Sequence, residues 1–86
     1  MPRISRFFGI SIAMYYDDHS PPHFHVIYSG HEAQVALDDW RVLQGDVSSR
    51  VMTLVREWAE MHSTELRDDW ELARRGLPLN PVAPLD

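Results

Sequence analysis

Three histidines, His19, His23 and His25, lie close together in the stretch DDHSPPHFHV, which runs from Asp17 to Val26. Imidazoles titrate near neutrality, so two of them can serve as general base and general acid in one reaction. Imidazoles are also ordinary ligands of zinc and related metals, especially beside a carboxylate. The stretch therefore predicts acid–base catalysis or a metal site.

Acid–base chemistry without a metal would suit the cleavage of RNA. Beside two histidines, that reaction needs an arginine to stabilise a pentacovalent phosphate and a tyrosine to position it. Arg6, Tyr15 and Tyr16 precede the histidine stretch and are the candidates for these parts, with Tyr16 preferred as the tyrosine. The catalytic set predicted for this reaction, which uses no cofactor, is His19, His23, His25, Arg6 and Tyr16.

A metal-dependent hydrolase is an alternative interpretation of the same residues. His23 and His25 are two positions apart on a predicted strand, so their imidazoles point the same way, with Cα atoms ~7 Å apart. The preceding loop would supply the remaining ligands, and zinc or manganese would be the ion. The ligand set predicted for this case is Asp18, His19, His23 and His25, with Asp17 as another carboxylate of the same loop.

A non-enzymatic binding module is the other alternative. Loops rich in Asp, Ser and Pro are ordinary turns, and a strand can carry histidine on its solvent face without consequence. Such a module would dock a small partner protein through its polar sheet face or its Pro-rich tail. The chain has 86 residues and no cysteine, so its core is thin and a homo-oligomer is also open.

Charge and hydropathy limit the binding partners and the cellular location that we expect. The net charge is -5 and there is no lysine, which argues against a broad surface for duplex DNA. The first 16 residues contain Arg3 and Arg6 and no acid, so a small RNA site there stays open. No apolar run approaches the ~18 residues of a membrane span, and no secretory signal is recognisable, so we expect a cytoplasmic protein.

Alternating apolar residues predict a sheet that would hold the histidines. Four segments alternate with period two, at residues 7–15, 23–29, 31–37 and 40–44. Ser29-Gly30 and Asp38-Asp39 are predicted turns. The register that puts the apolar residues on one face pairs Ile12 with Val26, Val26 with Ala33 and Val35 with Val42. A four-stranded antiparallel meander follows, with His23 and His25 on the opposite, polar face.

From Asp46 the apolar period becomes helical. A stripe through Val51, Trp58 and His62 predicts a helix capped by Asp46 or Ser48. Ser63-Thr64 offers a second cap, so two helices are favoured over one kinked helix. The tail, residues 77–86, holds three prolines and should run extended over the surface. The predicted fold is a single α+β domain over residues 1–86, with two C-terminal helices covering the apolar face of the sheet (ββββαα).

The chain also resembles a known family. The resemblance rests on ISRFFGI, MYYDDHSPPHFHV, EWAEMHSTEL and DDWELARRGLPLNPVAPL, which together span nearly the whole length. These phrases are similar to the small prokaryotic family catalogued as domain of unknown function 4160. Its members are similar in gene setting to toxin–antitoxin modules, often beside domain of unknown function family 2442. The resemblance implies a bacterial protein with a small cognate partner and a toxin-like role.

The leading hypothesis combines the two lines of argument. The chain is predicted to be the toxin-like half of a toxin–antitoxin pair that cleaves RNA without a metal. The binding module and the metal-dependent hydrolase remain the alternatives.

Overall fold

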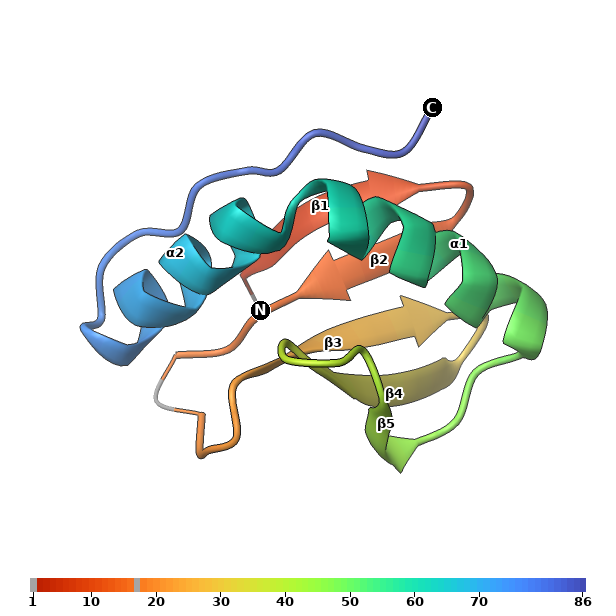
Figure 1. Ribbon diagram of the computed structural model, residues 1–86, viewed down its shortest axis with the longest axis horizontal. Coiled ribbons are helices and arrows are strands. Elements are labelled where there is room, and N and C mark those ends of the chain that lie inside the picture. Colours follow the sequence, from red (N-terminus) through yellow and green to blue (C-terminus); the bar gives the residue numbers. More distant parts are fainter. Residues whose placement is uncertain (1, 17) are drawn as a thin grey trace.

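The computed structural model describes residues 2–16 and 18–86, which form an antiparallel sheet followed by two helices (Figure 1). The elements are β1 (Arg3–Phe7), β2 (Ile10–Ala13), β3 (His23–Tyr28), β4 (His31–Ala36), β5 (Val42–Gly45), α1 (Ser49–Met61) and α2 (Ser63–Arg74). The strands lie in the order β1-β2-β3-β4-β5. The predicted class, an antiparallel meander with two C-terminal helices, is confirmed.

The sheet has five strands because β1, at residues 3–7, was not predicted, and the predicted strand 7–15 starts in the turn that joins β1 to β2. Phe7 pairs with Ile10, and Phe8 and Gly9 form the turn with φ of 52° and 78°. Positive φ at both turn positions matches the twist of the flanking strands. A bulky residue rarely adopts positive φ, so Phe8 gave no turn signal.

The predicted register of the central strands is confirmed. Ile12 pairs with Val26 and Val26 with Ala33, while Val35 pairs with Val42. The predicted fourth strand at 40–44 begins later, because Trp40 has a φ of 62° and belongs to the turn. One apolar set therefore faces the helices.

Both helices pack on that apolar face, and the break between them lies at His62, which ends α1 and precedes α2. The Ser48 Oγ accepts a hydrogen bond from the Val51 amide at 3.3 Å, so Ser48 is the N-cap of α1. The predicted second cap at Ser63-Thr64 is wrong, because the capping position is His62 and it makes no side-chain cap bond. In Figure 1, α2 extends toward the end of the sheet where β3 begins.

The tail runs extended along β1, as predicted, and is part of the fold (Figure 1). The Val82 amide donates to the Ile4 carbonyl at 2.7 Å, and Val82 is buried. Trp58 Nε1 donates to the Ala83 carbonyl at 2.8 Å. The Asn80 amide donates to Oδ1 of Asp69. The tail therefore bonds to the sheet and to both helices.

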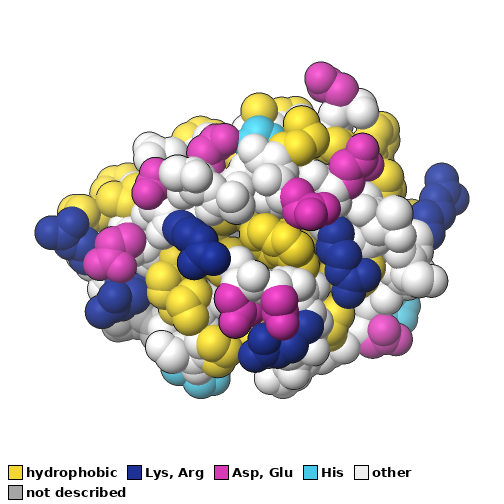
Figure 2. Space-filling model, viewed as in Figure 1, with side chains coloured by type: hydrophobic (Ala, Val, Ile, Leu, Met, Phe, Trp, Pro, Cys, Tyr) yellow, Lys and Arg dark blue, Asp and Glu magenta, His cyan; other side chains and the backbone are white. Residues whose placement is uncertain are grey.

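The surface carries charges of both signs. Figure 2 shows acidic and basic side chains interspersed on the face that bears the helices. A face of this kind creates no extended positive field for nucleic acid. Within the described residues, no helix is long and apolar enough to cross a membrane.

Candidate metal centre

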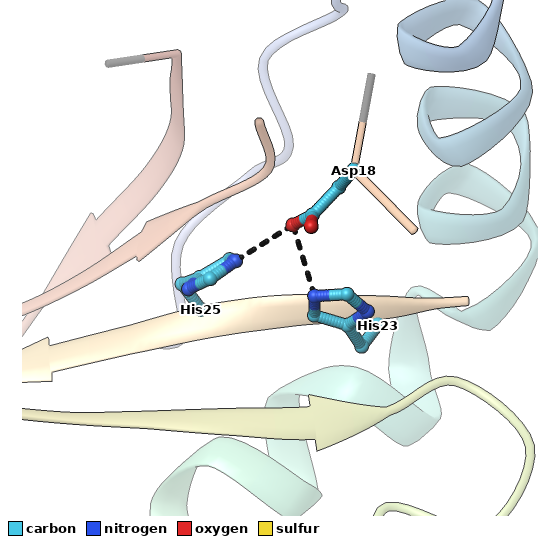
Figure 3. A group of neighbouring side chains, drawn as sticks. All are labelled: Asp18, His23 and His25. Atoms are coloured by element: carbon cyan, nitrogen blue, oxygen red, sulfur yellow. Dashed lines mark hydrogen bonds and ion pairs between the residues drawn. The ribbon is translucent and has the colours of Figure 1, made fainter. Parts of the chain in front are cut away.

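Asp18, His23 and His25 point toward one another (Figure 3). The two histidines lie at alternate positions of β3 and so project from the same face. Asp18 reaches them from the loop before β3. Its Oδ2 lies 2.9 Å from His23 Nε2 and 3.0 Å from His25 Nε2. The predicted common orientation of the two imidazoles is confirmed.

Both imidazoles are buried, which the expectation of a wet polar face did not foresee. His23 is 1% exposed and His25 is 5% exposed. The ring of Trp70, from α2, lies 5.4 Å from the His23 ring, and the Tyr15 ring meets His25 edge-on at 4.2 Å. A sheet predicted from alternation alone leaves this face exposed to solvent. In the structure, the loop that carries Asp18 and the residue Trp70 of α2 cover it. The cluster therefore sits in an environment with little water.

A second acceptor fixes each imidazole through its other ring nitrogen. Nδ1 of His23 donates to the Pro21 carbonyl at 2.7 Å. Nδ1 of His25 donates to Oε2 of Glu32 at 2.8 Å. Contacts of this kind set the tautomer and the ring orientation of metal-binding histidines. Through its Nε2, His25 also forms a hydrogen bond with Oδ2 of Asp18 at 3.0 Å.

Asp18 is ionised at all ordinary pH values. Burial alone would raise the pKa of its carboxyl group, but this is outweighed by hydrogen bonds from His25 and His19 and by the nearby His23. Together these lower the pKa of Asp18 to about 2 from the ordinary 3.8. Asp18 thus supplies a fixed negative charge at the centre of the cluster.

The Nε2 atom of His23 is a buried polar atom without a hydrogen-bond partner among the described residues. It is buried, and despite lying 2.9 Å from Asp18 Oδ2 it is not aligned for a hydrogen bond with any described atom. Buried polar atoms in native proteins are nearly always satisfied. Within the described residues, this buried nitrogen therefore lacks the partner that such atoms usually have.

His19 lies at the mouth of the cluster. Its backbone amide and its Nδ1 both donate to Oδ1 of Asp18, at 3.0 and 3.1 Å. Its side chain is 83% exposed. His19 therefore holds the outer oxygen of the Asp18 carboxylate, while the inner oxygen faces the two buried imidazoles.

Of the two other predicted catalytic residues, Arg6 lies on a strand that does not neighbour β3, and Tyr16 is an exposed residue two positions before Asp18. Arg6 is on β1 and pairs with Ser11 of β2, so a whole strand separates it from β3. Tyr16 is 45% exposed. Among the described contacts, neither side chain forms a hydrogen bond or an ion pair with the histidines. Asp17, the alternative carboxylate, lies outside the described residues.

Three residues around the cluster are outside the predicted catalytic and ligand sets. Glu32 holds His25, and the register offered a clue, because Ile27 pairs with Glu32 and His25 is two positions away. Trp70 contacts His23 only because of where α2 lies. Tyr15 was one candidate for the tyrosine of the RNA reaction. Burial raises the pKa of its phenol, as do the Glu32 and Asp18 carboxylates.

The comparisons with known proteins give one match. The family model described as "Domain of unknown function (DUF4160)" matches residues 9–71, a span that includes every member of the cluster. No curated protein and no solved structure matches the chain. The match confirms the family resemblance and carries no activity with it.

Proposed function

The chain belongs to the family described as Domain of unknown function (DUF4160), and we propose that it binds a divalent transition metal through Asp18, His23 and His25. The proposed centre is hydrolytic. Its ligand atoms would be Oδ2 of Asp18 and Nε2 of each histidine, which all lie within 4.8 Å of one another.

The observation that carries the proposal is that three ligand atoms converge and that one of them, the buried His23 Nε2, has no aligned hydrogen bond among the described residues. Both Nδ1 atoms are committed as donors, to the Pro21 carbonyl and to Glu32. On the opposite side of the rings, His25 Nε2 forms a hydrogen bond with Oδ2 of Asp18 at 3.0 Å, whereas His23 Nε2 lies 2.9 Å from the same oxygen without an aligned hydrogen bond. A metal ion bound by Asp18 Oδ2 and both Nε2 atoms would satisfy His23 Nε2.

The dimensions suit a small ion. With metal–ligand bonds of about 2.0–2.1 Å, the donors of a tetrahedral site stand about 3.3 Å apart. The two nitrogen–oxygen distances here are 2.9 and 3.0 Å. An outward movement of the Asp18 carboxylate by a few tenths of an ångström would admit the ion. Asp18 is the most exposed of the three side chains, at 15%, and so the one best placed to move.

Two imidazoles and one carboxylate suit zinc, with manganese and ferrous iron as close competitors. Three protein ligands leave a position for water, and a metal lowers the pKa of such a water to ≈ 7. The hydrogen-bond acceptors behind the two imidazoles would differ in strength. The Glu32 carboxylate would make His25 a stronger metal ligand, whereas His23 is held only by the backbone carbonyl of Pro21.

Metal-free cleavage of RNA by a toxin-like protein is the second candidate. Its supporting observation is that two protonated imidazoles would satisfy the same contacts to Asp18 that a metal would. A small cognate protein partner belongs to this candidate through the family resemblance. Among the described contacts, Arg6 and Tyr16 form no hydrogen bond or ion pair with the histidines, and their parts in this reaction stay predictions.

Metal analysis tests the proposal directly. Untagged protein is mixed with zinc, manganese or cobalt, and bound metal is measured after gel filtration together with tryptophan fluorescence, because Trp70 touches His23. We expect one metal ion per chain for wild type and for His31→Ala, an exposed histidine outside the cluster. We expect little or none for His23→Ala and His25→Ala.

Absence of bound metal from folded wild-type protein would overturn the metal centre. Induction of the same variants in a bacterial host then decides the second candidate. Growth arrest by wild type but not by folded His23→Ala would support it, and arrest by both would contradict a catalytic role for His23.

A further inference from the structure

We propose that His19 is an exchangeable fourth ligand of this centre, so that the protein itself closes and opens the metal's reactive position. This inference rests on the proposed metal site. It assigns His19 a regulatory role, in which its imidazole competes with water and with anionic substrates for one coordination position.

Asp18, His23 and His25 leave one position of a tetrahedral metal unfilled. Other neighbouring donors are already engaged, since Glu32 is bound to His25 and Pro21 to His23. Trp70 and the strands enclose the buried side of the cluster. The unfilled position therefore faces the loop that carries His19.

His19 is close enough to fill this position. Its Nδ1 lies 3.1 Å from Oδ1 of Asp18, and the oxygens of one carboxylate are about 2.2 Å apart, so Nδ1 is within about 5 Å of the ligating oxygen. The ring centroids of His19 and His23 are 6.1 Å apart. Side-chain rotation alone can cover such a distance.

The contact that holds His19 away is weak. One hydrogen bond at 3.1 Å anchors a ring that is 83% exposed, and such exposed pairs stabilise a conformation only weakly. Because Nδ1 is the donor, a neutral ring leaves Nε2 as a lone pair in solvent. His19 thus has two roles within reach, holding Asp18 from outside or binding the metal.

The test uses cobalt as the probe, because the visible absorption of Co²⁺ reports its coordination number. Wild type, His19→Ala and the matched control His31→Ala are each loaded with one equivalent of Co²⁺ and titrated with azide. Both histidines are exposed, so both variants remove a surface imidazole, but only one removes the proposed ligand.

We expect wild type and His31→Ala to show the intense absorption of a four-coordinate ion and to bind azide weakly. His19→Ala should absorb less, bind Co²⁺ about 10- to 100-fold more weakly, and bind azide at least about tenfold more tightly. The absorption change on adding azide is a readout that a purely structural role would not move.

Three results would overturn the inference in different ways. Equal spectra and equal azide affinities for His19→Ala and wild type would show that His19 is not a ligand. Complete loss of Co²⁺ from His19→Ala would make it a permanent ligand and not an exchangeable one. Failure of wild type to bind Co²⁺ would instead remove the proposed function on which the inference rests.

Discussion

The two imidazoles of the cluster are held by unequal acceptors, a neutral carbonyl for His23 and a carboxylate for His25. A charged acceptor strengthens the hydrogen bond and makes the opposite ring nitrogen a better ligand. Substituting one of these acceptors should therefore change the metal affinity without removing a ligand.

Glu32→Ala tests this second carboxylate. We expect the zinc affinity to fall by about 10- to 100-fold, because His25 loses both its orientation and the nearby charge. Competition with a chromophoric chelator measures the change. Glu60→Ala removes an exposed carboxylate elsewhere and should leave the affinity unchanged; equal losses from the two variants would contradict the role of Glu32.

Asp18 makes the stability of the folded protein depend on pH. Its pKa is about 2 in the folded protein against 3.8 ordinarily, so the unfolded chain binds the proton more readily. The stability that Asp18 contributes is therefore fully present above pH 3.8 and is lost as the pH falls through about 2. The shift corresponds to a contribution on the order of 2 kcal/mol.

Asp18→Asn should remove that dependence from the metal-free protein. We expect the difference in unfolding free energy between wild type and variant to be constant above about pH 5 and to shrink on acidification. Urea titrations at several pH values measure it. Asp86→Asn, at the exposed C-terminus, should show no such trend, and a difference that grows toward low pH would refute the assignment.

The sequence was sufficient for the members of the cluster but not for its surroundings. A two-residue spacing on a strand determines that His23 and His25 face the same way, and Asp18 is close in sequence. The contacts of Trp70 and Pro21 depend on the position of α2 and on the path of the loop. Neither follows from local spacing, so the burial of both imidazoles could not be predicted.

At the scale of elements, the tail behaves as a structural component. It donates backbone hydrogen bonds to Ile4 and to Asp69 and inserts Val82 into the core. Burial raises the pKa of Asp69, as do the charges of Asp68 and Glu65, against the opposing bond from Asn80. Deleting the tail would remove part of the fold and would be an unsuitable test of partner binding.

Val82→Ala measures how much the tail contributes. We expect a loss of about 2 kcal/mol in unfolding free energy, from the apolar surface removed and the cavity left behind. Asn80→Ala keeps the backbone amide and changes an exposed side chain, so its effect should stay within about 0.5 kcal/mol. Equal, small effects would mean that the tail is dispensable.

The elements themselves could be predicted wherever periodicity and turn chemistry agreed. Ser29-Gly30 and the register of β3 with β4 are examples. The β1–β2 hairpin was missed because apolar alternation continues across Phe8, whose positive φ is set by the tertiary fold. The break between the helices was predicted, but its capping residue was not, because His62 caps without a side-chain bond to the backbone.

At the scale of the whole molecule, the histidine cluster and a surface groove lie at opposite ends of β3. The histidines lie at the start of β3, whereas Tyr28, at its other end, lines a groove of about 600 Å³ with Phe8 and the first turn of α1. The groove therefore does not include the residues of the proposed metal centre, and we expect metal binding to act mainly on the stability of the domain.

Zinc should therefore raise the melting temperature of the wild-type protein. A ligand at 100 times its dissociation constant stabilises the folded state by ≈ 2.7 kcal/mol, which for a domain of this size means on the order of 10 °C. Calorimetry with and without zinc measures the shift. His23→Ala should show none, and an unchanged melting temperature for wild type would count against a metal centre.

The short sequence separation of the ligands has a consequence for how the ion is acquired. Asp18 and His25 are only seven positions apart, and closing a loop of that length costs roughly 2 kcal/mol of chain entropy. All the proposed donors therefore form one local chelating segment, which a nascent chain would expose before its helices are synthesised. Metal capture could precede folding, and the ion would then help to set the β2–β3 connection on which the rest of the domain assembles.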